Sequence, residues 1–300
     1  TTDKELHLAG NLWFDGLAPS PKPVSGTVVG SGVDNLTLKS GDAQVVVGGS
    51  IDLGDKTLNL EAPKGAVIVD GGVQVQSGGT FLADGVTVQV GDVANSGTIT
   101  FESDKTVAMG NAVVNAGTMN VKANGATTMK GMTIAEGAVV NIDAVSVADV
   151  IANGDVVVNG DIAQGTTGQT GTLNLLASDV DFSANSLNVT GDYIVNDGNG
   201  VWTVANSARF GGNISLDGGT SLRLVAGGVS ANMLNNGGNL QIVAQNGINV
   251  KSVANSGNLL LDSGSGYTTV DTFDVGGVGV ITLAGAGLNA NDGTFATQNR

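Results

Sequence analysis

An all-β fold, in which coils of about 20 residues stack as a parallel β-helix (β-solenoid), is predicted by three features of the 300-residue sequence. Apolar and polar residues alternate in short runs, one strand phrase returns at a fixed spacing, and glycine supplies 48 residues while aromatic residues make up only 4%. Alternation with a period of two is typical of β-strands. A repeat of about 20 to 50 residues is typical of stacked supersecondary units.

The alternating runs extend from Ser25 to about Asn291, and each run is closed by Gly, Asn, Asp or Ser. Runs rich in β-branched residues and bounded by such turn residues predict strands. We find no segment of three helical turns with a helical pattern, because glycines and β-branched clusters interrupt every such stretch. Among the predicted strands are residues 45–47, 67–69, 86–90, 98–101, 156–158, 173–175 and 259–261.

The strand phrase repeats at Gly97–Phe101, Gly117–Val121 and Gly137–Ile142, so the glycines that begin it recur at one fixed interval. The pentapeptide Val-Ala-Asn-Ser-Gly occurs at 93–97 and again at 253–257, a whole number of these intervals later. The interval suits one coil of short strands and tight turns, with strands of successive coils about 4.8 Å apart. The spacing loosens between Asn153 and Asn213, which predicts an irregular coil or a loop there.

The segment 1–24 differs from the rest of the chain, because it combines an apolar cluster with three of the four prolines. A solenoid has open ends that need a cover, so we predict a cap at 1–24, the solenoid at 25–291 and a tail at 292–300. Alternatively, the first segment docks onto a second copy and drives end-to-end assembly into a filament. The candidate assembly residues are Leu8, Leu12, Trp13, Phe14 and Leu17.

The charge balance excludes some partners. Lys and Arg number 12 against 27 Asp and Glu, and the net charge of −15 would repel nucleic acid and anionic lipid. No apolar run is long enough to predict a transmembrane segment. Cysteine is absent, which removes disulfides and thiolate metal sites, and a stacked core does not need them.

Residues for catalysis are sparse, and we predict that the chain is not an enzyme and has no cofactor. A glycoside-cleaving site needs paired carboxylates, and Asp179 and Asp181 are the best candidates because they would share one face of a strand. His7 is the only histidine, so a multi-histidine metal site is excluded. Calcium, which prefers oxygen ligands, is a possible cofactor at Asn196–Gly200, although this stretch also suits a plain turn.

Ice binding is a further alternative for a solenoid, and it requires a flat ladder of Thr-x-Thr in coil after coil. Thr98 and Thr100 fit such a ladder. Thr118 continues one column, but Asn120 interrupts the other.

The repeated Gly-Thr/Asn-hydrophobic-x-hydrophobic phrase, the Asn-Ser-Gly turns, the acidic balance and the missing cysteines resemble bacterial surface proteins. The likeness is to filamentous-haemagglutinin-like adhesins and autotransporter passengers, and it covers most of residues 25–291. It implies a right-handed β-helix that is secreted across an outer membrane and acts in adhesion, surface coating or biofilm.

We therefore expect an extracellular structural or adhesive protein of a bacterial cell surface, within a filament, sheath or adhesin. Its expected partners are further copies of itself, and surface glycans or the surface of a host or neighbouring cell. The alternatives are a polysaccharide lyase or hydrolase with a β-helical fold, and a glycan-binding adhesin without turnover.

Overall fold

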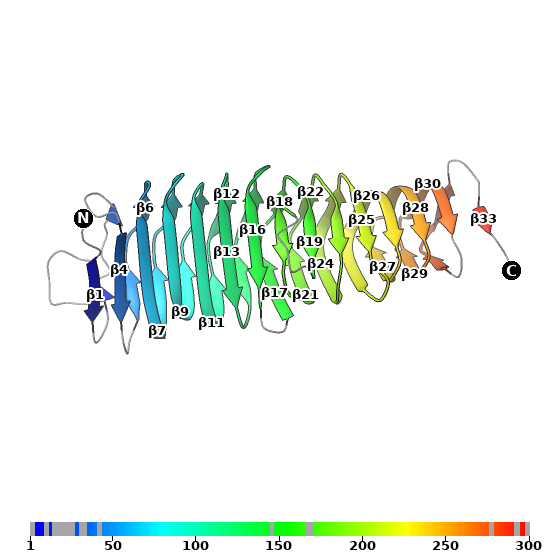
Figure 1. The fold of residues 1–300 in the computed structure, drawn as a ribbon. Helices are drawn as coiled ribbons and strands as arrows, with labels where there is room; N and C mark the ends of the chain where they lie inside the picture. The colour runs from blue at the N-terminus through cyan, green and yellow to red at the C-terminus, as the bar shows by residue number, and fades with distance from the viewer. Residues whose placement is uncertain are drawn as a thin grey trace. The chain divides into compact units, whose positions relative to one another are not determined.

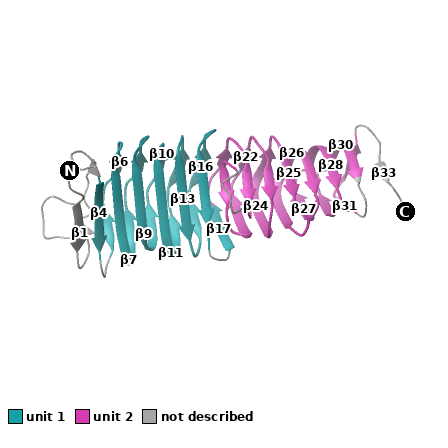
Figure 2. Cartoon of the chain, in the orientation of Figure 1, with its two compact units in different colours: residues 1–151 teal, residues 152–300 magenta. Residues whose placement is uncertain are grey.

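The computed structural model describes residues 4–8, 12–13, 28–29, 35–40, 44–144, 147–165, 171–275, 279–290 and 295–297. Within these ranges every regular element is a β-strand, and the strands pair in parallel. The chain divides into two compact units, residues 1–151 and 152–300 (Figure 2). The predicted all-β parallel β-helix is confirmed in each of them.

The strands of unit 1 form three columns, in which each strand pairs with a strand of the next coil (Figure 1). The first column contains β1 (Lys4–Leu8), β4 (Asn35–Ser40), β7 (Thr57–Val69), β9 (Thr80–Val90), β11 (Thr98–Ala108), β13 (Thr118–Ala123) and β16 (Val139–Asp143). The second contains β2 (Leu12–Trp13), β5 (Val45–Val47), β14 (Thr127–Met129) and β17 (Val147–Ala152), together with the later parts of β7, β9 and β11. The third contains β3 (Val28–Val29), β6 (Ile51–Leu53), β8 (Val73–Val75), β10 (Val93–Asn95), β12 (Asn111–Val114) and β15 (Gly131–Ile134).

Unit 2 also has three columns, and its long strands again continue from one column into the next. The first column contains β21 (Asp179–Ala184), β24 (Asn199–Phe210), β26 (Ser221–Asn236), β27 (Asn239–Ala244), β29 (Asn258–Asp262) and β31 (Val280–Ala284). The second contains β18 (Val156–Val158), β22 (Leu187–Val189), β28 (Ile248–Asn255), β30 (Tyr267–Val275) and β32 (Gly287–Ala290), with parts of β24 and β26 between them. The third contains β20 (Leu173–Leu175), β19 (Ile162–Gln164), β23 (Tyr193–Val195), β25 (Asn213–Leu216) and β33 (Phe295–Thr297), with parts of β26, β28 and β30.

The spacing of paired residues shows coils of about 20 residues, as the repeat predicts. Thr98 pairs with Thr118, which is the pairing that the repeated phrase requires. The alignment of the next repeat on its glycine is wrong by one position, because Thr118 pairs with Val139 and not with Ala138. Ala138 N donates a hydrogen bond to the Ala135 carbonyl at 3.2 Å, so a tight turn at 135–138, with Gly137 at a φ of 78°, takes up the extra position.

Side chains that point into the coils form rows of apolar residues. One such row contains Leu58, Phe81, Ile99, Met119 and Val140, and each of them is at most 2% exposed. Each large side chain that is fully buried stabilises the fold by about 1.5–3 kcal/mol. Because the rows continue from coil to coil, they form one core in each unit without disulfides.

The repeated pentapeptide has the same structural role at both of its positions. Asn95 and Asn255, its central residues, are 0% and 2% exposed. The amide of Asn95 accepts a hydrogen bond from Gly97 N and donates one to the Thr118 carbonyl, both at 2.9 Å. Asn255 Oδ1 accepts a hydrogen bond from Asn236 Nδ2 at 2.7 Å. A buried asparagine therefore closes the turn and ties it to a neighbouring coil.

One coil of unit 2 is longer than the others. Ile162 of β19 pairs with Leu173 of β20, which lies less than one regular coil later in the chain. Ile162 also pairs with Tyr193 of β23, which lies well over one regular coil later. The prediction that the period loosens in this part of the chain is confirmed. The regular spacing returns where Val180 pairs with Gly200.

An aromatic cluster fills the interior next to the long coil. Trp202 stacks on Phe182 with ring centroids 4.3 Å apart, and its ring lies 4.6 Å from that of Tyr193. The Tyr193 hydroxyl donates to Gln164 Oε1 at 2.6 Å, and Gln164 Nε2 donates to the Ser178 carbonyl at 3.0 Å. Burial raises the pKa of the Tyr193 phenol well above its ordinary value, and Trp202 opposes the shift in part. The neutral phenol is therefore part of the core.

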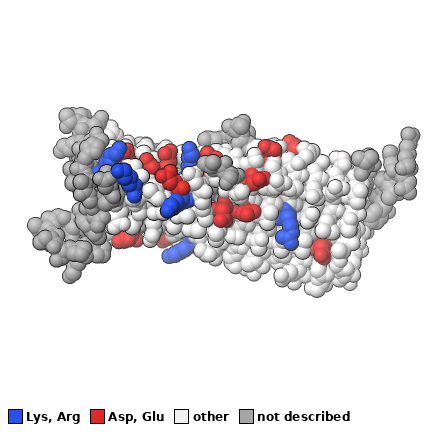
Figure 3. Space-filling model, turned by 90° about the horizontal axis from the view of Figure 1, so that it is seen from below, with Lys and Arg blue, Asp and Glu red and all other residues white. Residues whose placement is uncertain are grey.

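A row of charged side chains lies on the outer surface of the first column in unit 1. Lys39, Glu61, Asp84, Glu102 and Lys122 occupy paired positions along it. Lys39 Nζ lies 2.9 Å from Glu61 Oε2. Partial burial of Asp84, followed by the negative charges of Glu102 and Glu61, raises its pKa. Figure 3 shows basic and acidic side chains close together over this unit.

The segment 1–24 contributes β1 and β2, whose backbones pair with β4 and β5 in the same parallel register as later coils. Leu8 ends β1, and Leu12 and Trp13 form β2. Phe14 and Leu17 lie outside the described residues. Within the predicted tail, β33 pairs with β30. The capping and assembly roles of these segments stay predictions.

Candidate functional site

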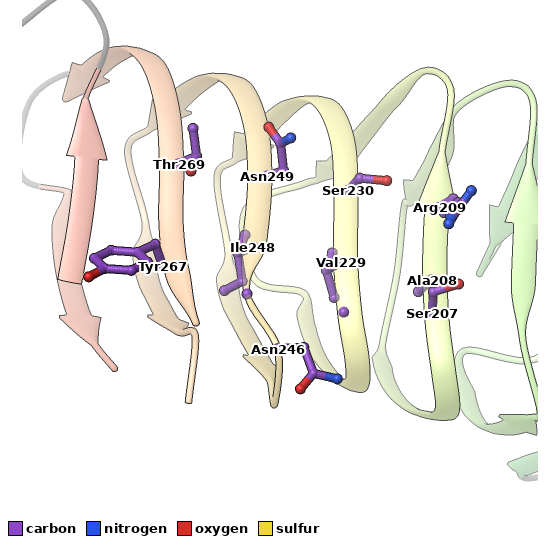
Figure 4. Close-up of a pocket in the computed structure, with 12 residues that line it drawn as sticks. Ser207, Ala208, Arg209, Val229, Ser230, Asn246, Ile248, Asn249, Tyr267 and Thr269 are labelled. Atoms are coloured by element: carbon purple, nitrogen blue, oxygen red, sulfur yellow. The ribbon is translucent and has the colours of Figure 1, made fainter. Parts of the chain in front are cut away.

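A shallow groove crosses the outer face of the second column in unit 2 (Figure 4). It has a volume of about 470 Å³, and its lining comes from four successive coils that contribute β24, β26, β28 and β30. Ala208, Val229 and Ile248 pair along the stack and point inward beneath it. Because side chains alternate along a strand, the residues on either side of these three face outward.

Two glycines form the floor of the groove. Gly228 and Gly247 directly precede the paired residues Val229 and Ile248. A β-carbon added at Gly228 would have only the Gly247 carbonyl oxygen near it, at 3.9 Å. Gly247 has a φ of 122°, a backbone conformation that favours glycine. The hollow exists because both coils lack a side chain at this position.

A row of polar side chains follows one side of the groove. Arg209, Ser230, Asn249 and Thr269 occupy paired positions on the four strands, and Figure 4 shows them side by side. Arg209 and Asn249 are exposed, and the other two are half-buried. None of the four side chains forms a hydrogen bond or an ion pair with another described residue. Their donors and acceptors therefore face solvent.

Tyr267 lies at one end of the groove and is 55% exposed. Its ring lies over Gly287, the paired residue of β32, where a β-carbon would come within 3.0 Å of Tyr267 Cε1. Glycine at position 287 thus leaves room for the ring. The result is an exposed aromatic surface at the end of the groove opposite Arg209 (Figure 4).

The charge of the groove differs from that of the rest of the chain. The described residues that line it include one cationic residue, Arg209, and no Asp or Glu. Two hollows of comparable size in unit 1 are lined in part by Asp92, together with Asp70 and Lys130 in one and Asp52 in the other, so each has more acidic than basic residues. The groove in unit 2 can therefore accept an anionic group, and its amides and hydroxyls can bond to hydroxyl-rich molecules.

No family model, no curated protein and no solved structure matches this chain. In the part of the chain that the structure describes, no helix is long and apolar enough to cross a membrane. In the same residues, no group of three or more His, Cys, Asp or Glu side chains is placed to hold a metal ion. The resemblance to surface adhesins stays a prediction.

Asp179 and Asp181 lie on one face of β21, as predicted, because Val180 and Phe182 between and after them are buried. A catalytic pair needs two carboxyl groups that act together, but the Asp179 carboxylate bonds to Asn199. Its Oδ1 accepts hydrogen bonds from Asn199 N at 3.0 Å and from Asn199 Nδ2 at 2.9 Å. The carboxylate therefore joins two coils, while Asp181 is exposed.

The loop Asn196–Gly200 is a turn between coils. Gly198 has a φ of 76°, and Asp197 Oδ2 accepts a hydrogen bond from Ser178 Oγ at 3.0 Å. Asn199 bonds to Asp179 and begins β24. The oxygen atoms expected to bind calcium are thus partly used within the fold, and a calcium ion at this loop stays a prediction.

Sequence reasoning missed a ladder of polar side chains at the turn before the third column of unit 2. Asp161 Oδ1 accepts a hydrogen bond from Asp192 N at 2.8 Å, and Asp192 Oδ1 accepts one from Asn213 N at 2.7 Å. Asn232 Nδ2 donates to Asn213 Oδ1 at 3.2 Å. A β-carbon at Gly212 would clash with the Asp192 carboxylate. The signal in the sequence is Gly, then Asp or Asn, then an apolar residue, at 160–162, 191–193 and 212–214.

The threonine row is longer than predicted, but it is single. It contains Thr57, Thr80, Thr98 and Thr118, in paired positions of successive strands. In the neighbouring outward row Thr100 pairs with Asn120. The described strands of this column do not form the double threonine ladder that ice binding requires.

Proposed function

We propose that this chain is a secreted structural and adhesive β-solenoid of a bacterial cell surface, built into a filament, a sheath or an adhesin. The observation that supports this most is that most of its polar side chains with resolved hydrogen bonds connect one coil to the next. Asp192 bonding to Asn213 and Asn236 bonding to Asn255 are examples from unit 2. These side chains thus stabilise a repetitive scaffold, as in solenoids that present extended surfaces.

Self-association is supported by the exposed edge of β31. Leu283 pairs with the fully buried Leu261 of β29 and occupies an inward position, yet it is 38% exposed. Among the described strands, β31 pairs only with β29. An unpaired strand edge with apolar side chains readily pairs with a further strand, either of a following coil or of another copy of the chain. A contact between different surfaces of two copies produces a filament when it does not close.

Negative-stain electron microscopy and sedimentation of the full chain over a range of concentrations test the assembly. We expect particles that join into longer assemblies as the concentration rises. Leu283→Lys should shorten them, whereas Thr282→Lys, at the exposed neighbouring position of the same strand, should not. Particles that stay single at every concentration, or equal assembly by both variants, would contradict association through this edge.

Antibodies against the chain test its location on the cells that produce it. We expect labelling of intact cells. Labelling that requires lysis of the cells would contradict the surface location.

A further inference from the structure

We propose that the groove of unit 2 binds an acidic oligosaccharide, whose carboxylate-bearing sugars lie along the stack of coils. The proposal rests on the proposed function in one respect: an adhesive surface protein is exposed to such polymers. Its physical basis is the groove itself, which combines a cation, a row of uncharged polar side chains and an aromatic ring (Figure 4).

The charge of the groove selects an anionic ligand. Arg209 is exposed, and it forms no ion pair with another described residue. A guanidinium group binds a carboxylate through two parallel hydrogen bonds. Among the described residues no Asp or Glu lines the groove, although the chain as a whole carries a net charge of −15. An acidic ligand therefore meets less repulsion here than at the hollows of unit 1, which contain Asp92.

The polar row suits a sugar chain that runs across the strands. Ser230, Asn249 and Thr269 continue the row from Arg209 over three successive coils. Coils repeat at about 4.8 Å, so the row extends over roughly 14 Å. Amide and hydroxyl groups both donate and accept hydrogen bonds, which matches the hydroxyl groups of a carbohydrate. The repeat presents similar groups at regular steps, as a polymer of repeating sugars requires.

Tyr267 supplies the apolar part of the site. Its ring is held over Gly287 and stays 55% exposed, so it offers a surface to the carbon-bound hydrogens of a sugar ring. The described lining of the groove lacks a pair of carboxylates, which glycoside hydrolysis requires. We therefore infer that the site retains the polymer and does not cleave it.

Isothermal titration of the full chain with oligogalacturonate, and with a carboxyl-reduced oligomer of the same length, tests the proposal. We expect the acidic oligomer to bind and the reduced one to bind about tenfold more weakly or not at all. Arg209→Gln and Tyr267→Ala should each weaken binding of the acidic oligomer about tenfold. Gly228→Gln should fill the hollow and weaken binding without distorting the backbone. Arg223→Gln, which removes an exposed arginine of β26 outside the groove, should bind like the parent.

Absent binding of the acidic oligomer, equal binding of the reduced one, or equal affinities of the Arg209→Gln and Arg223→Gln variants would overturn the proposal. These results are independent of the test of the proposed function. A chain that labels intact cells but does not bind the oligomer loses only this site. A chain that binds it but is confined within cells keeps the site and loses the surface role.

Discussion

Replacing Ile99 by aspartate tests the direction in which the side chains of unit 1 point. Ile99 is 0% exposed and lies in an inward row between Phe81 and Met119. Loss of its burial removes about 1.5–3 kcal/mol. A carboxyl group without a partner in this row costs roughly another 1–3 kcal/mol, even after it takes up a proton. The free energy of unfolding of the surrounding coils should therefore fall by about 2.5–6 kcal/mol.

The neighbouring substitution Thr100→Asp is the matched control. Thr100 faces outward and is half-buried, so a carboxylate there remains solvated and should cost no more than about 0.5 kcal/mol. Hydrogen exchange of the full chain, resolved by peptide, is the measurement. Because each coil contacts mainly its nearest neighbours, Ile99→Asp should remove protection from β9, β11 and β13 first.

Two results would refute this reasoning. If Ile99→Asp left the exchange of these strands unchanged, the side chain could not point into the coil. If Thr100→Asp cost as much as Ile99→Asp, the alternation of inward and outward positions along β11 would be wrong.

Three further predictions follow from single side chains. Asp192→Ala should lower the free energy of unfolding of unit 2 by about 1–2 kcal/mol in denaturant titration. Asp192→Asn should cost less, because it retains an acceptor for Asn213 N. Equal costs of the two variants would contradict the hydrogen bond between Asp192 and Asn213. The raised pKa of Asp84 means that its contribution to stability is present below the unfolded pKa of about 3.9 and is lost as the pH rises. In denaturant titrations, Asp84→Asn should therefore stabilise unit 1 at pH 7, by about 0.5 kcal/mol or less after solvent screening, and should have no effect near pH 3. An effect of the same size at both pH values would contradict the raised pKa. The raised pKa of Tyr193 means that its contribution to stability is present below the unfolded pKa of about 10 and is lost above it. In a Tyr267→Phe chain, phenolate absorbance should therefore appear only together with unfolding. Phenolate absorbance in the folded chain would contradict the burial of the Tyr193 phenol.

The strands and their buried faces could be predicted from the sequence because both depend on local alternation. Ile99 and Phe101 are buried, and Thr98 between turn and core is exposed, as a period of two requires. Register could not be predicted in the same way. Coil length varies with the turns, so the coil that joins Thr80 to its partner Thr98 is shorter than the coil that joins Thr98 to Thr118. A fixed period therefore did not find the pairing of Thr80 with Thr98.

The groove could not be predicted because its residues meet only after the coils have stacked. Arg209 and Tyr267 lie on strands β24 and β30, with two coils between them. Each is an ordinary exposed residue within its own strand. The hollow between them also depends on Gly228, which the sequence presents as one turn-type glycine among 48.

Carboxylates in a solenoid are ambiguous from sequence alone, because the same residue types can perform catalysis or join coils. Asp179 illustrates this, since its position on a strand suggested a catalytic pair while its oxygen atom binds the next coil through Asn199. The polar side chains that form no such bonds give a clearer indication of function. Arg209 and Asn249 are exposed and lie in a row of paired positions, where side chains of neighbouring coils could form hydrogen bonds with each other. The side chains of this row form no such hydrogen bonds with described residues. A repetitive scaffold that leaves these groups to solvent at regular steps can present them to a ligand with a matching repeat, and this is the physical reason for the proposed binding site.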